Sequence, residues 1–251
     1  LPEVEIIDMR EELKAGNMTM FSRKLYSKMQ QVLKEGQQVI LFQNRRGYSS
    51  FISCRECGEV IKCPHCDVSL SEHKGGKLVC HYCGYKILLP HQCPECNDLE
   101  LRPMGFGTEQ VEEEISTLFP QVKVERLDFD TARTRSAYER ILSNFEQRKT
   151  QILIGTQMLS KGLDFDNVSV VGILHADSLM NFPDFRAHER AYQLMAQVSG
   201  RAGRREKQGT VILQSSQPEH PLIQLVENHD YQRMARLQLT ERSMFRYPPY
   251  Y

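Results

Sequence analysis

The sequence predicts an α/β fold: a parallel sheet with helices on both faces, interrupted by a small cysteine-rich module. Apolar runs of strand length alternate with helical segments along most of the chain, which is typical of a parallel sheet covered on both faces. The alternation stops between Tyr48 and Gly105, where all eight cysteines lie. Among 251 residues, 40% are hydrophobic and 25% charged, as in a soluble globular protein. No apolar run reaches the roughly 18 residues of a membrane span, and no signal peptide is visible.

The N-terminal part supplies two strands and a helix. Val4 to Asp8 is predicted to be a short strand or extended entry, and Val39 to Phe42 is a continuous apolar run typical of a buried parallel strand. Between them, apolar residues from Phe21 to Leu33 recur with helical spacing, and Gly36 is a suitable stop.

A candidate phosphate site follows the second strand. Arg45, Arg46 and Gly47 come directly after it, and ligands of open α/β sheets gather at the carboxyl ends of strands. The two arginines could hold a phosphate; the alternative is an ordinary surface turn.

The cysteines form four CxxC pairs, which predict two zinc sites. Each pair can offer two thiolates, four thiolates complete a tetrahedral zinc site, and eight make two sites with none left over. Disulfides are disfavoured because no secretory signal is visible, and CxxC redox chemistry would need one pair rather than four.

The grouping of the pairs is predicted to be nested. The segment between the two inner pairs contains Gly75 and Gly76, which indicates a hairpin in the manner of a zinc ribbon. A sequential grouping stays open, but it leaves only five residues, 58 to 62, between the first two pairs. Histidines 65, 73, 81 and 91 are interpreted as solvated or as supporting the ligands. The predicted ligand sets are Cys63, Cys66, Cys80 and Cys83 for one zinc, and Cys54, Cys57, Cys93 and Cys96 for the other.

Charge limits what the module binds. The chain has a formal net charge of zero, so contact with nucleic acid must come from local clusters. Between residues 54 and 96 five basic and five acidic side chains cancel, and eight thiolates exceed the charge of two Zn²⁺ by four. A net negative module does not suit a broad phosphate clamp. A docking surface for a partner and a wedge between separating strands both stay open.

Alternation resumes after the module. Thr108 is a candidate N-cap of a helix whose apolar stripe runs from Val111 to Phe119, and its early glutamates suit the positive helix end. The further predicted elements are strands over 122–127, 151–155, 168–174 and 210–214, and helices around 138–145 (starting near Thr134 or Ser136), over 185–199 and over roughly 221–239.

Two motifs carry the functional interpretation. Residues 197–204, QVSGRAGR, place Arg201 and Arg204 three apart among small residues, on one face if the segment is helical. Planar guanidiniums suit a phosphate chain, and one placed on a transferring phosphoryl group acts as an arginine finger. A solvated basic turn is the alternative. Residues 152–165, ILIGTQMLSKGLDF, stand some forty residues earlier, and together the two resemble motifs V and VI of superfamily 2 helicases.

The resemblance extends along nearly the whole chain. LFQNRRGY, the four CxxC pairs, GFGTEQVEEEI, GTQMLSKGLDFDNV, DFRAHERAYQLMAQVSGRAGR and YPPYY occur in the order found in bacterial replication-restart helicases. This implies a RecA-like second helicase lobe over residues 1–53 and 97–235, a zinc-binding module over 54–96, and the start of a link to a further domain over 236–251.

The resemblance also implies functions. The family consists of ATP-dependent 3′-to-5′ DNA helicases that act at stalled forks, with ATP and Mg²⁺ as cofactors beside the zinc ions. Its partners are forked and single-stranded DNA, primosome proteins, single-stranded-DNA-binding protein and the loader of the replicative helicase; its location is cytoplasmic, with the nucleoid. Carried over by motif, Arg204 is the arginine finger with Arg201 and Gln197 beside it, Asp164 and Gly162 lie at the nucleotide, and Thr156 and residues Arg45, Arg46 and Gly47 face DNA.

One expected part is absent from these residues. No GxxxxGK[ST] loop and no Asp-Glu-x-His stretch occurs, so nothing cradles the β- and γ-phosphates, and the chain alone is expected not to hydrolyse ATP. Two other functions stay open: a zinc-stabilised module that binds protein or nucleic acid without catalysis, and another superfamily 2 translocase.

Overall fold

The computed structural model describes residues 2–43, 51–66, 68–73, 76–103, 107–160, 165–202 and 209–250. The chain divides into two compact units. The sheet unit comprises Leu1–Arg45, Phe106–His175 and Leu194–Ser215, and the cysteine unit comprises Arg46–Gly105, Ala176–Gln193 and Ser216–Tyr251. The predicted domain boundaries stay predictions.

The sheet unit contains six strands in the order β1-β11-β10-β2-β9-β8, all paired in parallel. This confirms the predicted α/β class with a parallel sheet. Every residue of β2 and β9 is buried, as continuous apolar runs in a sheet covered on both faces require. The strands are β1 (Glu3–Asp8), β2 (Gln38–Phe42), β8 (Val124–Leu127), β9 (Ile152–Gly155), β10 (Val168–Ile173) and β11 (Thr210–Ser215).

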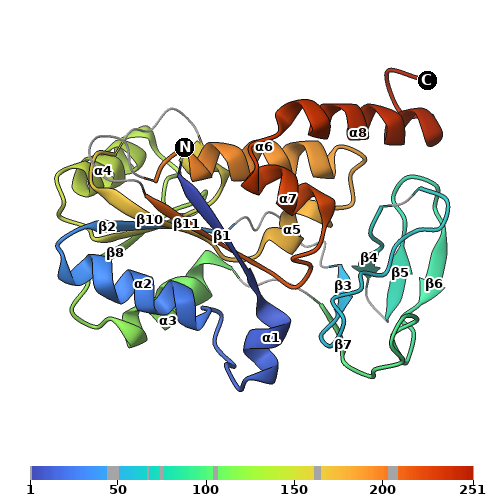
Figure 1. Cartoon of the computed structure of the whole chain (residues 1–251), viewed down its shortest axis with the longest axis horizontal. Helices are drawn as coiled ribbons and strands as arrows, with labels where there is room; N and C mark the ends of the chain where they lie inside the picture. Colours follow the sequence, from blue (N-terminus) through green and yellow to red (C-terminus); the bar gives the residue numbers. More distant parts are fainter. Residues whose placement is uncertain are drawn as a thin grey trace. The chain divides into compact units, whose positions relative to one another are not determined.

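Helices cover both faces of this sheet (Figure 1). On one face, α2 (Arg23–Lys34) and α3 (Thr108–Leu118) bury their apolar stripes against alternate residues of the central strands. On the other lies α4 (Arg135–Glu146), whose Phe145 ring meets Phe165 edge-on at 4.8 Å. A short helix, α1 (Met9–Lys14), follows β1, and a 3-10 turn (Gln157–Ser160) follows β9; neither is evident from periodicity.

Helix starts follow the capping rules, with one correction. The hydroxyls of Ser22 and Thr134 accept from backbone N–H groups in the first turns of α2 and α4, as N-caps do. Thr108 is not the N-cap of α3: Gly107 is, and Gln110 accepts from its N–H at 3.0 Å. The Thr108 hydroxyl instead donates a hydrogen bond to the Asp128 carboxylate at 2.7 Å.

The last predicted helix is two helices. α7 (Pro221–Glu227) ends before His229, which has φ +54°, and α8 (Tyr231–Met244) starts again behind the N-cap Asp230. α6 (Ala187–Ser199) begins two residues later than expected and ends before Arg201, so Arg201 lies in a turn and not on the helix. α5 (Ala176–Met180) was not expected. Within the described ranges, no helix is both long and apolar enough to cross a membrane.

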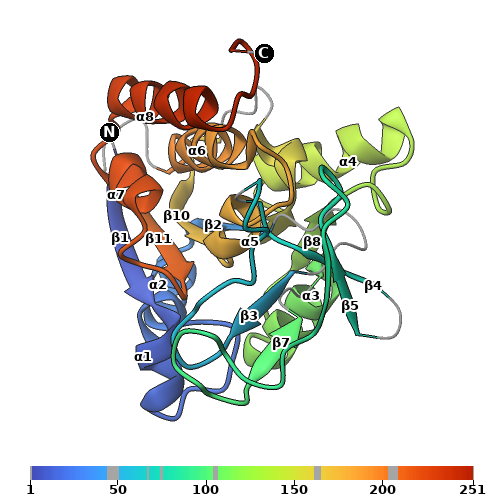
Figure 2. The same ribbon diagram turned by 90° about the vertical axis from the view of Figure 1, so that its right-hand side faces the viewer.

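In the cysteine unit, residues 51–103 form short antiparallel strands (Figure 2), and the unit's other segments contain α5, α7 and α8. β3 (Ile52–Cys54) pairs with β7 (Leu101–Pro103), and β4 (Ser71–His73), β5 (Lys77–Val79) and β6 (Lys86–Leu88) form a meander. The β4–β5 connection is the hairpin that Gly76, at φ +67°, was expected to permit. The core beneath it is small: Ile52, Ile61, Val68, Leu70 and Leu78 with two cysteines.

Candidate metal centres and helicase motifs

The structure gathers the eight cysteines into two tetrads. Cys54, Cys57, Cys93 and Cys96 form one, here called the outer tetrad; Cys63, Cys66, Cys80 and Cys83 form the other, the ribbon tetrad. Within each, all sulfur atoms lie within 4.8 Å of one another. This is the nested grouping, not the sequential one.

The sulfur spacing fits zinc and not disulfides. The Sγ atoms of Cys54 and Cys96, of Cys57 and Cys93, and of Cys63 and Cys83 are each 3.6 Å apart. A disulfide needs about 2.05 Å. Four sulfurs placed tetrahedrally at about 2.3 Å from Zn²⁺ stand about 3.8 Å from one another. The residues present therefore fit a zinc ion in each tetrad.

Three of the four CxxC turns, those whose following residue the structure describes, are completed by a residue in the left-handed conformation. In the first pair the Gly58 N–H donates to the Cys54 carbonyl at 3.0 Å, and Gly84 repeats this with Cys80 at 3.0 Å. The φ angles of Gly58 and Gly84 are +79° and +75°, and Asn97 fills the same place after Cys96 at +60°. Glycine and asparagine tolerate this conformation best, which explains their place after the second cysteine.

Without a cation some of these thiols resist ionisation, among them one in each tetrad, Cys66 and Cys57. Burial, followed by hydrogen bonds with Cys83 and Cys80, raises the pKa of Cys66 to about 12. Burial, with contributions from Cys96 and Cys93, likewise raises the pKa of Cys57. A divalent cation bound by the four sulfurs of a tetrad would stabilise them as thiolates, and its binding would release the protons of the thiols.

The histidines stay outside both tetrads. His73 and His81 are exposed, with their Nε2 atoms 3.3 Å apart, and His65 meets Tyr85 edge-on. This agrees with their interpretation as solvated or supporting groups.

The described helicase-motif residues lie on connections at two ends of the sheet. Thr156, which is buried, directly follows β9, and its N–H donates to the Leu127 carbonyl at 3.3 Å. Gly155 just before it is close-packed, since a Cβ there would lie 2.5 Å from the Leu159 side chain. Gln197 is an exposed residue of α6, and Arg201 follows that helix on the way to the amino end of β11. Thr156 and Arg201 are thus on connections to opposite strand ends.

Several predicted site residues lie outside the described ranges: Arg45, Arg46, Gly47, Gly162, Asp164 and Arg204. Their roles stay predictions.

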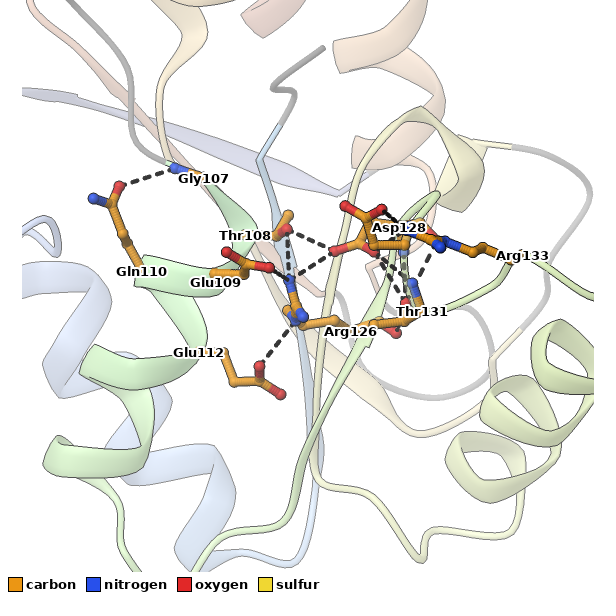
Figure 3. Close-up of polar contacts among 10 residues, drawn as sticks. Gly107, Thr108, Glu109, Gln110, Glu112, Arg126, Asp128, Thr131 and Arg133 are labelled. Carbon is orange, nitrogen blue, oxygen red and sulfur yellow. Dashed lines mark hydrogen bonds and ion pairs between the residues drawn. The ribbon is translucent and has the colours of Figure 1, made fainter. Parts of the chain in front are cut away.

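A polar network at the carboxyl end of β8 was not recognised from the sequence (Figure 3). The Arg126 guanidinium, 13% exposed, contacts Glu112 at 2.9 Å, Asp128 at 3.2 Å and Glu109 at 3.4 Å. Asp128 also accepts from the Thr108 hydroxyl. Two of the early glutamates of α3 are therefore ion-pair partners of Arg126, a role beyond the favourable placement at the positive helix end that the sequence predicts.

Asp128 also shapes the loop that follows. Its Oδ1 accepts from the backbone N–H groups of Asp130 and Thr131, both at 3.0 Å. Burial alone would raise the pKa of Asp128, but hydrogen bonds from Thr108 and Thr131 and the charge of Arg126 outweigh it and lower the pKa. The alternation Arg126-Leu127-Asp128 is the only sequence signal for this network.

Comparisons with known proteins agree with these features. Residues 63–87 match the model of the "PriA DNA helicase Cys-rich region (CRR) domain", and residues 105–206 match that of the "Helicase conserved C-terminal domain". Along 100% of its length the chain is 50% identical to replication restart protein PriA of Bacillus subtilis and 47% identical to that of Synechocystis. It is 43% identical to that of Haemophilus influenzae over 91% of its length. The chain spans about a third of each of these relatives, 31%, 31% and 32%.

Likeness to solved structures is weaker. RecG bound to a three-way DNA junction gives a TM-score of 0.49 at 12% identity, covering 95% of this chain and 22% of that one. The C-terminal domain of the DEAD-box protein Dbp5 gives 0.38 at 17% identity, covering 49% and 64%. Such scores establish no shared site.

Proposed function

We propose that this chain, which belongs to the PriA family of replication restart proteins, forms the second motor lobe of an ATP-dependent 3′-to-5′ DNA helicase. The observation that carries the proposal is the match along the entire chain to PriA. The model of the cysteine-rich region covers the ribbon tetrad, and the helicase model covers the part of the sheet unit from α3 to the end of α6.

The sheet topology supports a nucleotide-facing side at the amino ends of β10 and β11. These strands are neighbours, with Val170 opposite Thr210. Gly162 and Asp164 precede β10 in the sequence, and Arg201 and Arg204 precede β11. We assign Arg204 as the arginine finger, because a guanidinium can neutralise the charge that develops on a transferring phosphoryl group. Arg201 would contact the phosphates, with Gln197 and Asp164 beside the nucleotide.

The topology likewise supports a DNA-facing side at the carboxyl ends of β2 and β9. The Gln43 N–H donates to the Gly155 carbonyl at 2.9 Å, so the residues that leave these two strands start side by side. Arg45, Arg46 and Gly47 follow the first strand, and Thr156 follows the second. Arginine side chains and the Thr156 hydroxyl would bind backbone phosphates, which gives affinity without base specificity.

The tetrads would hold two zinc ions as structural centres. Zinc here would supply folding free energy to a module whose apolar core is small. ATP with Mg²⁺ would bind against a first lobe carrying the phosphate-binding loop that these residues lack. Primosome proteins, single-stranded-DNA-binding protein and the helicase loader are proposed as partners in the cytoplasm, at the nucleoid. The net negative charge of the zinc-loaded module favours protein docking over DNA binding for its own surface.

ATP hydrolysis by the full-length protein tests this function. We expect hydrolysis that depends on single-stranded or forked DNA, and 3′-to-5′ unwinding, whereas the isolated 251-residue chain is inactive with the same DNA. A full-length protein that binds partners but never hydrolyses ATP would favour the alternative of a pure binding module.

A further inference from the structure

Tyr247, in the segment 245–250 that follows α8, contacts the loops of the ribbon tetrad. We propose that Tyr247 and Tyr82 couple the docking of this segment to zinc binding by the ribbon tetrad, so that each stabilises the other. The inference rests on the proposed zinc occupancy, and it concerns the ribbon tetrad alone. All residues involved belong to the cysteine unit.

The first contact joins the segment to a cysteine of the tetrad. The Tyr247 hydroxyl donates a hydrogen bond to the Cys66 carbonyl oxygen at 3.1 Å, across 181 residues of sequence. Groups that bond to the backbone of a metal ligand fix its orientation and hence its fit to the metal. Tyr247 is therefore placed to act as a positioning residue for the Cys66 sulfur.

The second contact reaches the other cysteine pair of the same tetrad. Tyr82, between Cys80 and Cys83 in the sequence, meets the Tyr247 ring at 6.0 Å and 64°. The Tyr82 hydroxyl also accepts from the Phe185 N–H at 3.2 Å. Tyr247 thus contacts a residue in each of the two CxxC motifs that form the ribbon tetrad.

Phe185 and Arg242 hold Tyr247 in place. The Phe185 ring stacks on Tyr247 at 4.8 Å and 23°, and the Arg242 guanidinium lies 5.3 Å from the Phe185 ring centroid. Arg242 is mostly buried and ion-paired with Glu189, which is also mostly buried. Stacked rings and a cation over a ring face are favourable arrangements that fix side-chain orientation. The segment is therefore fastened at the end of α8 as well as on the tetrad.

The outer tetrad is supported by different residues. Gln217 donates to the Gly58 carbonyl at 2.8 Å, next to Cys57. Loss of the Tyr247 contacts should therefore loosen one zinc and leave the other. Because thermodynamic coupling is reciprocal, loss of the ribbon zinc should in turn release residues 245–250.

The forward test compares Tyr247→Phe with Tyr250→Phe in the full-length protein. Both changes remove one hydroxyl from the same segment, and Tyr250 is 51% exposed. Zinc release is followed with a chelating indicator, and one kinetic phase is expected from each tetrad. Cys83→Ser, which disrupts the ribbon tetrad, and Cys96→Ser, which disrupts the outer tetrad, assign each phase to its tetrad. Tyr247→Phe should speed release from the ribbon tetrad by about three- to tenfold, the usual effect of one lost hydrogen bond. Release from the outer tetrad, and both rates in Tyr250→Phe, should stay within twofold of wild type.

The reverse test measures hydrogen exchange in residues 245–250. Cys83→Ser should deprotect this segment, and Cys96→Ser should not. Equal zinc release in the two tyrosine variants, or faster release of both zinc ions in Tyr247→Phe, would overturn the inference while leaving the proposed function intact. A wild-type protein with no zinc at the ribbon tetrad would refute this inference together with the zinc part of the proposed function. Absence of zinc from the outer tetrad alone would refute only that part of the proposed function.

Discussion

Replacing Gly58 by alanine tests the geometry of the outer tetrad. Gly58 has φ +79°, and a Cβ built on it would lie 2.5 Å from the Ser216 carbonyl oxygen. The left-handed conformation costs an alanine about 1–2 kcal/mol. Relief of the overlap must also move the Gly58 carbonyl or Ser216, which weakens the hydrogen bond from Gln217, worth about 0.5–1.5 kcal/mol. We expect a total loss of about 1.5–3.5 kcal/mol.

Gly84→Ala is the matched control. Gly84 occupies the same place after its CxxC pair at φ +75°, but its Cβ would meet no atom within 4 Å. The Gly84→Ala variant should lose only the free energy that alanine needs to adopt the left-handed conformation, about 1–2 kcal/mol. The assay is hydrogen exchange in the zinc-loaded protein, with the opening free energy read at amide 58 or 84, each bonded to the first cysteine of its pair. Equal losses in the two variants would refute the close approach of Gly58 and Ser216.

Three further predictions concern acid, metal and DNA. Asp128→Asn should lower the free energy of unfolding at pH 7 by about 1.5–3 kcal/mol, since it removes a charged acceptor. The pKa of Asp128 is lower in the folded than in the unfolded state, so the ionised carboxylate stabilises the fold above about pH 4, and this stabilisation is lost as the pH falls further. The free energy of unfolding measured by urea titration should therefore depend less on pH in Asp128→Asn than in wild type over that range. Chelation of zinc should raise hydrogen exchange over residues 54–96 while the six-stranded sheet keeps its protection; loss of both together would contradict separate cores. Arg45→Ala or Arg46→Ala in the full-length protein should weaken single-strand binding for all sequences and reduce the salt slope by about 0.7, whereas Arg135→Ala should not; an altered sequence preference with an unchanged slope would exclude a phosphate role.

Local patterns predicted most of the sheet unit. β2 and β9 are buried on both faces, so each had to be a continuous apolar run, and that run is visible in the sequence. The cysteine grouping was predictable because a hairpin between the inner pairs brings their ends together.

Non-glycine turns and long-range contacts could not be predicted in this way. The break between α7 and α8 occurs at His229 in a left-handed conformation, a residue that gives no stop signal. Thr108 looked like a cap, but its hydroxyl is taken by Asp128, twenty residues away. The Tyr247 contact with Cys66 spans 181 residues and depends on tertiary structure alone. Periodicity reports which residues are buried, not which polar partners they find.

The most direct test of the proposed function is ATP turnover by full-length Arg204→Ala, with Arg205→Ala as the neighbouring control. We expect Arg204→Ala to bind ATP nearly as well as wild type, because a phosphate-binding loop outside this chain would supply most ground-state contacts. Hydrolysis on forked DNA should fall by about 10³-fold or more, since an arginine finger acts on transition-state charge, and Arg205→Ala should stay near wild type. Near wild-type hydrolysis by Arg204→Ala would contradict the assignment of this chain as the arginine-bearing half of the ATPase site.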